Sequence, residues 1–520
     1  MRFQKADIVF VTPSYEKKLT HESIGTLILA KRAQLAGFNV EIVRFCDVEM
    51  GDYASFRHNL ISIILNYSPH IVSFYCRAAE YPILIDIVEH IKTDYPKITT
   101  VFGGPQAELV AEDTLTSFSG VDYVCCGEGE NTIVPLLDLL ITYHNKTDLT
   151  DSIPGLVYRD KNGSICKNKL PEFLSDNYTR HYNYYDLIPQ DIISNSDCVT
   201  IDVGRGCPFS CSFCSTKAFW KQKFRLRNIH DTTSEIKYVI TNLGIKSFSF
   251  SHDLFTANKS RVLQFCHTIQ SESIAIRWNC SSRIDCIDHE MIDNMVSAGL
   301  VAIYYGIETG SPRMQTLINK KIDIDDARDI VQYSIKKGVA VTTSFIYGFP
   351  QETEEDLEHT LELIHQFLKI GVNVQLHCLA LEKGSSLYEA YHQELFFSPN
   401  KISNSFGIKE LSTMIENYPK LFSTFWDFKT PLRVEMRFLH ELHTVGRAYP
   451  SEFVKIIECL RRNGMTYVDA YRFLIKILED SFIKFANSNV TLSKAICYFL
   501  ILKITAKITS DSSLKKHYDK

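Results

Sequence analysis

Short β-branched runs alternate with amphipathic segments of helical period over the first 145 residues. Strands separated in this way by helices predict parallel β–α–β units. Helical stretches such as 24–35 lie between the runs, and five runs are expected to be strands: ADIVFVT, FNVEIVRF, HIVSFY, ITTVFGG and VDYVC.

Five such strands fit a doubly wound, flavodoxin-like (Rossmann-like) α/β layer. Layers of this kind bind ligands beyond the carboxyl ends of the strands, where the strand order reverses. The loops at that edge would begin at Thr12, Cys76, Gly103 and Cys126. We therefore expect a ligand-binding domain over residues 1–145.

The alternation is interrupted over residues 146–195. The segment IPGLVYRDKNGSICKN predicts a hairpin around Asn162 and Gly163, since Asn-Gly favours the primed turns of two-residue hairpins. The Tyr- and Asn-rich segment that follows, NYTRHYNYYDLIP, predicts a linker.

A second series of strands and helices covers residues 196–390. Six units predict a partial (βα)6 barrel, and by analogy with complete barrels the chemistry should lie at the carboxyl ends of the strands: CVTIDV, KSFSFSH, IAIRWNC, LVAIYYG, VAVTTSFIYG and VNVQLHCLAL. Residues 391–520 show helical periodicity with little strand signal. They predict a helical C-terminal domain, which we expect to close or shape a pocket.

Length and composition agree with several compact domains. The chain has 520 residues, 45% hydrophobic and 22% charged, which at roughly 150 residues per domain suggests about three domains. The net charge of -5 offers no general attraction to nucleic acid. The apolar stretch near the N-terminus is too short for a signal peptide and has no small-residue cleavage site after it. The most apolar run, 495–504, contains Lys503 and is shorter than the roughly 20 residues of a membrane span. We expect a cytoplasmic protein with no nucleic-acid or membrane partner.

Fifteen cysteines in such a chain are expected to be free thiols, and clustered ones are candidates for metal binding. Three of them, Cys207, Cys211 and Cys214, lie in GCPFSCSFC directly after the strand CVTIDV. Structural zinc takes four protein ligands, often from two C-x2-C pairs, and this segment offers only one such pair, Cys211 and Cys214, beside a third cysteine. Three thiolates on a four-iron cluster would instead leave one iron open. The alternative is that three cysteines merely share a loop.

The spacing C-x3-C-x-Phe-C resembles the signature of the radical SAM superfamily. The resemblance implies that Cys207, Cys211 and Cys214 hold a [4Fe-4S] cluster whose open iron chelates S-adenosylmethionine (SAM). An electron from an external donor of the flavodoxin or ferredoxin type would then cleave SAM to a 5'-deoxyadenosyl radical. Phe213 matches the aromatic position that packs near the adenine.

Later strand ends extend this resemblance. The order SRID, GIETGS, GFPQETEED is similar to the subgroup that includes cobalamin-dependent enzymes and methylthiotransferases. It implies that Glu308 contacts SAM and that Arg283 and Asp253 lie in the cofactor site, with a surface ion pair or a helix cap as the alternative for the last two. Arg225 and Arg227 also match a recurrent position, although solvated charges are the simpler explanation there.

The N-terminal half is similar to the cobalamin-binding domain that precedes many such barrels. VFGGPQAEL and VDYVCCGEGENTI carry this similarity, which implies cofactor contacts at Gly103, Gly104, Gly127 and Gly129. One element departs from the pattern: the D-x-H-x-x-G motif that supplies a histidine to cobalt is absent, and His21 has the wrong spacing. Cobalt would then be bound without that histidine.

The leading hypothesis is a cobalamin-dependent radical SAM enzyme that methylates an unactivated carbon of a small metabolite or peptide. A second hypothesis uses the same cofactors for a rearrangement or cyclisation without methyl transfer. A third is a non-catalytic cobalamin or metal sensor. Methylthiotransferases carry a different N-terminal domain with three further cysteines and an RNA-binding module, neither of which is visible here.

Overall fold

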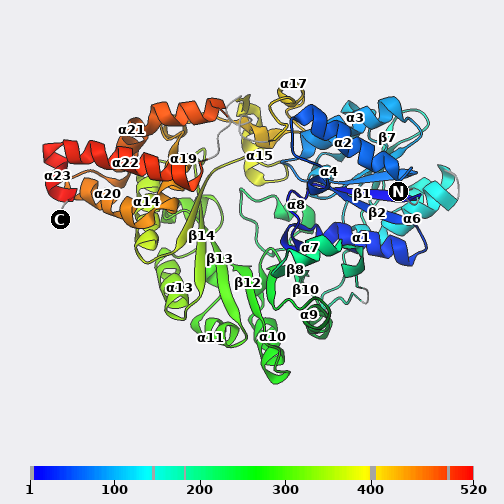
Figure 1. Cartoon of the computed structure of the whole chain (residues 1–520), viewed down its shortest axis with the longest axis horizontal. Coiled ribbons are helices and arrows are strands. Elements are labelled where there is room, and N and C mark those ends of the chain that lie inside the picture. Colours follow the sequence, from blue (N-terminus) through cyan, green and yellow to red (C-terminus); the bar gives the residue numbers. More distant parts are fainter. Residues whose placement is uncertain (1–4, 143–146, 181–182, 399–405, 489–491, 519–520) are drawn as a thin grey trace.

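A seven-stranded sheet forms the N-terminal part of the computed structural model, which describes residues 5–142, 147–180, 183–398, 406–488 and 492–518 (Figure 1). The strand order is β2-β1-β3-β4-β5-β6-β7, and the first five strands are parallel. Their bounds are β1 Ile8–Thr12, β2 Val40–Arg44, β3 Ile71–Tyr75, β4 Thr99–Gly103 and β5 Tyr123–Cys125. This order is the flavodoxin-like one, so the predicted doubly wound layer is confirmed.

Alternation along β1 shows why helices cover both faces of this sheet. Ile8 and Phe10 pack on one face with α1 and α6, whereas Val9 and Val11 pack on the other with α2 and α3. Successive side chains of a strand point to opposite faces, and here both sets are buried. The helices are α1 Ile24–Leu35, α2 Tyr53–Asn66, α3 Tyr81–Asp94, α4 Pro105–Leu109, α5 Ala111–Ser117 and α6 Ile133–Leu137.

The predicted hairpin is present, but it belongs to the first sheet. Strands β6 (Leu156–Arg159) and β7 (Ile165–Lys167) pair antiparallel and continue the sheet beyond β5. The turn is longer than the two residues expected from Asn-Gly. The Asp160 carboxylate accepts hydrogen bonds from the backbone of Asn162 and Ser164, and this stabilises a loop that spans 160–164.

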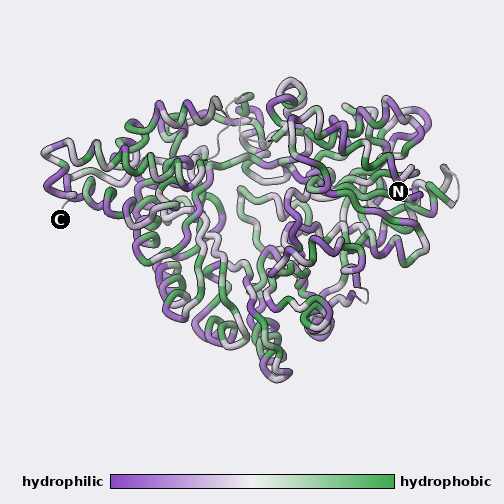
Figure 2. Tube along the Cα trace, viewed as in Figure 1, coloured by the Kyte–Doolittle hydropathy of each residue, from purple (hydrophilic) through white to green (hydrophobic). Residues whose placement is uncertain are grey.

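The second sheet is the predicted open barrel. Six parallel strands follow the order β15-β14-β13-β12-β11-β8, and the helices between them cover the outer face. The strands are β8 Cys198–Asp202, β11 Ser247–Ser251, β12 Arg277–Ser282, β13 Leu300–Glu308, β14 Ala340–Tyr347 and β15 Asn373–Cys378, and the helices are α9 Ile229–Leu243, α10 Lys259–Ser271, α11 His289–Ser297, α13 Ile324–Lys336 and α14 Glu354–Lys369. Figure 2 shows hydrophilic positions along the outward turns of α11 and α13.

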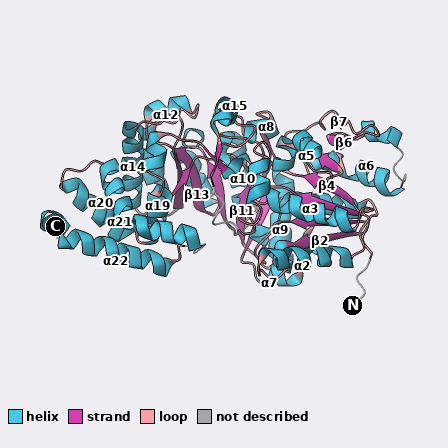
Figure 3. Cartoon of the chain, turned by 90° about the horizontal axis from the view of Figure 1, so that it is seen from above, coloured by secondary structure: helices cyan, strands magenta, loops and turns pink. Residues whose placement is uncertain are grey.

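The C-terminal residues pack in two places. Segment 406–425 joins the core of the N-terminal domain through Ile408, Ile415 and Phe422. The last helices instead pack beside β15 and α14, and they lie at the opposite end of the molecule from the N-terminus (Figures 1 and 3). They are α19 Leu439–Ala448, α20 Pro450–Arg462, α21 Tyr467–Ser488, α22 Lys494–Ser510 and α23 Ser512–Tyr518. The domain boundaries at 145, 195 and 390 stay predictions.

Within the described residues, no helix has both the length and the apolar character that crossing a membrane requires.

Candidate functional site

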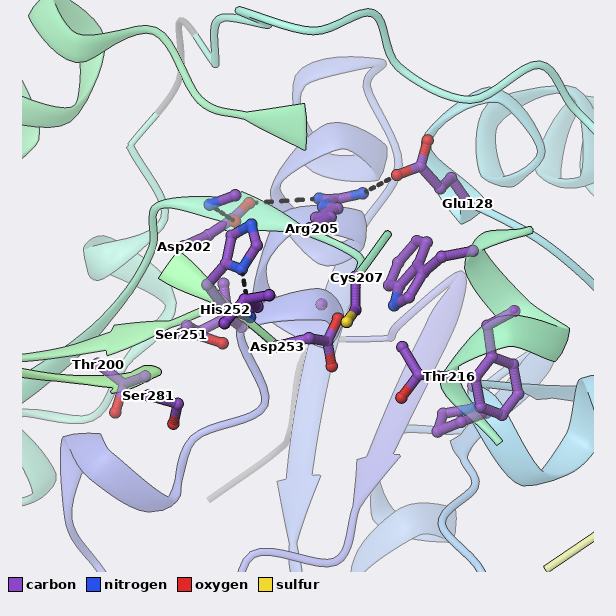
Figure 4. Close-up of a pocket in the computed structure, with 18 of the residues that line it drawn as sticks. Glu128, Thr200, Asp202, Arg205, Cys207, Thr216, Ser251, His252, Asp253 and Ser281 are labelled. Atoms are coloured by element: carbon purple, nitrogen blue, oxygen red, sulfur yellow. Dashed lines mark hydrogen bonds and ion pairs between the residues drawn. The ribbon is translucent and has the colours of Figure 1, made fainter. Parts of the chain in front are cut away.

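A cavity of about 1080 Å³ lies between the carboxyl ends of the two sheets. The end of β3 and the loops after β4 and β5 form one wall, and the ends of β8, β11, β12 and β13 form the other. Ligand pockets usually enclose roughly 300–1,000 Å³, so this space can hold more than one small molecule. Figure 4 shows part of it, with Cys207 and Asp253 directed into the same space.

Cys207, Cys211 and Cys214 all line this cavity. The backbone of Gly206 starts their loop with a φ of +86°, and a Cβ there would lie 1.9 Å from the carbonyl oxygen of Lys223. Only glycine fits this close approach. The Gly206 N–H donates to the Asp253 carboxylate at 3.0 Å, so Asp253 anchors the loop that carries the cysteines.

Each of the three sulfurs has a polar neighbour. The Arg283 guanidinium donates to the Sγ of Cys211 at 3.3 Å, and Cys214 shares a hydrogen bond of 3.0 Å with the hydroxyl of Thr216. Burial raises the pKa of the Cys207 thiol to about 11, against a hydrogen bond from the backbone of Phe209 that lowers it. Hydrogen bonds to sulfur are a means by which proteins tune ligating thiolates.

The donor set, three cysteine thiols that line one cavity, fits an iron-sulfur cluster, whose irons are held by thiolates. No three His, Cys, Asp or Glu side chains in the described part of the chain converge on one point as ligands of a single ion would. A four-iron cluster needs no such convergence, because each thiolate binds a different iron. That the three cysteines ligate such a cluster stays a prediction.

Arg283 is buried and held by several partners. Its guanidinium pairs with Asp285 at 2.9 Å, donates to the carbonyl oxygen of Lys320 at 2.7 Å, and stacks over the Phe209 ring at 3.8 Å. The alternative of a surface ion pair therefore does not describe it. Asp253 is exposed to the cavity, yet the surrounding protein partly removes its carboxyl group from water and so raises its pKa.

Glu308 lies at the end of β13 with a φ of +73°, a conformation that costs a residue other than glycine on the order of 1 kcal/mol or more. Its carboxylate accepts from Lys320 Nζ at 2.5 Å, and both side chains are buried. The pair needs Gly306, since a Cβ there would lie 2.6 Å from the Glu308 Oε1. Phe213 lines the cavity beside this pair, with Lys320 Nζ 5.9 Å from its ring centre. Lys320 was not predicted from the sequence, and Gly306 was included only as part of the GIETGS motif, without a role of its own.

All four predicted glycines of the N-terminal domain line the cavity. A Cβ on Gly103 would meet only the Cys125 carbonyl oxygen, at 3.9 Å, so this backbone is open to a ligand. At the other three glycines, another side chain occupies the place that a Cβ would take: the Tyr75 ring at Gly104, Pro171 at Gly127 and Leu29 at Gly129. Protein packing accounts for these three glycines, and their contact with a cofactor stays a prediction.

Tyr75 also lines the cavity, at the end of β3. The next two residues do not line it: Cys76 is fully buried, and Arg77 is ion-paired with Glu80. His21 lies in a short 3-10 helix before α1, with 42% of its side chain exposed, in agreement with a position at a helix start.

A buried ion network joins the two walls. Arg205 pairs with Glu128 at 2.9 Å (Figure 4) and with Glu130 at 2.6 Å. Arg225 donates to both oxygens of Glu128 at 2.9 Å. Arg225 and Arg227 are only 4% and 3% exposed, so the interpretation of these two as solvated charges is wrong. No local sequence pattern could predict these pairs, because their residues lie 75 to 97 positions apart in the chain.

The C-terminal helices do not shape this cavity. Within the described residues, every residue of its lining lies at or before Lys320. The expectation that residues after 390 would close the pocket is therefore not met, because α19 packs against the outer strand β15 instead.

Two protein-family models match this chain, one in the N-terminal domain and one in the barrel. Residues 16–137 match the model of the B12 binding domain, and residues 201–364 match the model of the radical SAM superfamily.

Curated relatives cover part of the chain. An uncharacterized methyltransferase, PH0819, from Pyrococcus horikoshii is 31% identical over 308 residues, which are 58% of this chain and 66% of that protein. The anaerobic magnesium-protoporphyrin IX monomethyl ester cyclase of Rubrivivax gelatinosus is 24% identical over 52% of this chain and 49% of its own length. This chain thus spans between about half and two thirds of these relatives.

The fold is also found among solved structures. The cobalamin-dependent S-adenosylmethionine radical enzyme OxsB, solved with aqua-cobalamin bound, superposes with a TM-score of 0.62 at 12% identity. The match covers 99% of this chain and 84% of OxsB. At this level of identity the likeness shows a shared fold.

Proposed function

The chain belongs to the cobalamin-dependent radical SAM enzymes, and from that premise we propose that it methylates an unactivated carbon of a small molecule or peptide. The relative from Pyrococcus, named as a methyltransferase, supports methyl transfer. The weaker similarity to a cyclase favours, as a second candidate, a rearrangement or cyclisation with the same cofactors.

The cofactors carry the difficult chemistry. When bound, SAM on a [4Fe-4S] cluster supplies a 5'-deoxyadenosyl radical, and cobalamin supplies the methyl group. Cys207, Cys211 and Cys214 would ligate three irons and leave the fourth for SAM. The turn at Gly103 would receive the cobalamin.

The chain's own side chains would position SAM. Glu308 offers its carboxylate to the SAM amino group, and Lys320 holds that carboxylate in place. Phe213 offers an aromatic face to the adenine. The positively charged guanidinium of Arg283 lies beside the Cys211 sulfur, where it would partly balance the negative charge of the cysteine thiolates.

One observation carries this proposal. The cysteine loop and the loops of the B12-binding domain face a single cavity, and Arg205 ties the first to Glu128 of the second. Radical formation and methyl supply would then act on one substrate in a shared cavity.

By-products of SAM distinguish the candidates. We would load the purified protein anaerobically with iron, sulfide and cobalamin, and add SAM and a reductant. Methylation predicts both S-adenosylhomocysteine and 5'-deoxyadenosine. A rearrangement predicts 5'-deoxyadenosine alone, and a non-catalytic sensor predicts neither product. The proposal fails if S-adenosylhomocysteine is absent.

Three further features stay predictions: an external electron donor of the flavodoxin or ferredoxin type, a cytoplasmic location and the absence of a nucleic-acid partner. A loss of SAM cleavage when the chemical reductant is replaced by buffer, and its return with reduced flavodoxin, would support the first.

A further inference from the structure

The six strands of the barrel present two chemically different faces. Residues directed toward the helices are buried and mostly apolar, such as Phe248 and Phe250 of β11. The residues that alternate with them are polar and partly exposed. We call this second face the barrel lumen; it includes Thr200, Ser249, Asn279, Ser281, Tyr304 and Thr342.

Such a face is unusual for a parallel sheet, in which both faces normally read as apolar. In complete barrels of this kind, bulky branched side chains fill the interior. Here the lumen is hollow instead: Ser281 and Tyr304 line both the main cavity and an adjoining one of about 280 Å³, which Asn279 and Thr342 also line. The lumen therefore continues the cofactor cavity into the barrel.

Neighbouring strands place these polar groups in rows. Ser249 is in register with Thr200 on one side and Asn279 on the other, and its hydroxyl donates to the Asn279 side-chain oxygen at 3.0 Å. Ser281 is in register with Tyr304, and Tyr304 with Thr342. Figure 4 shows the side chains of Thr200 and Ser281 lying near each other.

The positive charges that line the cavity are already paired. Of the described residues that line it, the arginines and lysines are Arg205, Arg283 and Lys320, and each has a carboxylate within 3 Å. His252 adds no charge near neutrality, because burial lowers its pKa to about 4. A phosphate or carboxylate on a substrate would find no free cation here.

We infer that the substrate is a neutral small molecule bearing several hydroxyl or amide groups, of the chemical class of sugars and cyclitols, which the barrel lumen binds by hydrogen bonds. This inference rests on the proposed function and names the substrate class for it. An apolar ring system would bury the hydroxyls of Thr200 and Ser281, for which the described residues supply no hydrogen-bond partner, at roughly 1–3 kcal/mol for each. A site built of such groups discriminates strongly against ligands that lack hydrogen-bonding partners.

Saturation-transfer NMR on the protein loaded with cluster and cobalamin tests this inference. The probes are methyl α-glucopyranoside and myo-inositol as neutral polyols, glucose 6-phosphate as an anion, and cyclohexylmethanol as an apolar ring. We expect signals from the neutral polyols. Binding of only the anion or only the apolar ring, or of no probe at millimolar concentration, would overturn the inference.

Adjacent threonines provide a matched control. Thr342 faces the lumen, where its hydroxyl accepts from the Asn373 side chain at 3.2 Å. Thr343 faces the helices and is fully buried. Thr342→Val should weaken polyol binding about threefold to tenfold, the loss of one hydrogen bond, whereas Thr343→Val should leave it unchanged. Equal effects of the two substitutions would place the probe outside the lumen.

SAM by-products separate this inference from the proposed function. If S-adenosylhomocysteine and 5'-deoxyadenosine form while polyols do not bind, only the substrate class is wrong. If neither by-product forms, the proposed function itself fails.

Discussion

Arg205 Nη1 lies 2.9 Å from Glu128 Oε1, so a residue two positions before the first cysteine of the loop is ion-paired with the loop after β5 of the other domain. Both side chains are largely buried. Breaking a buried pair by removing one charge leaves the other uncompensated, which is costly. The relation suggests that docking of the two domains and the position of the cysteine loop depend on each other.

Glu128→Gln should therefore lower the free energy of unfolding by about 3 kcal/mol, since Arg205 and Arg225 both lose their shared carboxylate. The matched control is Glu112→Gln, which removes an exposed pair with Lys167 and should cost less than 1 kcal/mol. Urea unfolding measures both. Equal losses in the free energy of unfolding for the two variants would show that the interdomain pair stabilises the protein no more than an exposed pair does.

Cysteine substitutions test which thiols hold the cluster. Cys211→Ala should reduce iron and sulfide content after anaerobic reconstitution to a small fraction of that of the unaltered protein, and Cys207→Ala and Cys214→Ala should do the same. Cys286 is the informative control: burial raises its pKa to about 11, with Asp285 and the nearby Cys207 adding to the shift, yet it does not line the cavity. Cys286→Ala should keep its cluster. Loss of the cluster in that variant would mean that the fourth iron is capped by protein.

Arg283→Gln should make the reduction potential of the cluster more negative. The substitution removes a positive charge and a hydrogen bond at 3.3 Å from the Cys211 sulfur, and the more reduced cluster is the more negative form. A shift of about 60 mV would correspond to a tenfold change for one electron. Arg283→Lys keeps the charge and should restore part of the potential. Redox titration followed by electron paramagnetic resonance (EPR) gives the values, and an unchanged potential in Arg283→Gln would contradict the assigned contact.

Gly306→Ala should weaken SAM binding at least tenfold. The added methyl group would lie 2.6 Å from Glu308 Oε1 and 2.9 Å from Lys320 Nζ, so the carboxylate and the ammonium group must shift from their present positions. Gly51→Ala is the control, because no atom lies within 4 Å of a Cβ at that position. Calorimetric titration of SAM into the reconstituted proteins compares them. If both variants bind SAM equally, Glu308 does not have the role proposed for it.

Local pattern was enough to predict the fold, because each strand and its cover of helices are encoded by neighbouring residues. The continuous apolar run IVFVT of β1 and the alternating SFSFS of β11 carry that information directly. The cysteine spacing likewise lies within eight residues. Cys207, Phe213, Arg283 and Glu308 could be assigned to one site because parallel strands bring their carboxyl ends together.

Contacts between domains could not be predicted from the local sequence pattern. Nothing local to Arg225 indicates Glu128, and nothing local to Leu421 indicates that its carbonyl accepts from the Gln106 side chain. The longer turn after β6 depends on the Asp160 carboxylate, which competes with the two-residue turn that Asn-Gly favours. In each case tertiary or side-chain hydrogen bonds decided between alternatives that the pattern left open.

EPR of the reduced, reconstituted protein with and without SAM tests the central claim most directly. An iron that the three cysteines leave open predicts a [4Fe-4S] signal whose g values change when SAM is added. A signal that SAM leaves unaltered, or a purified protein that takes up zinc in place of iron and sulfide, would contradict the account.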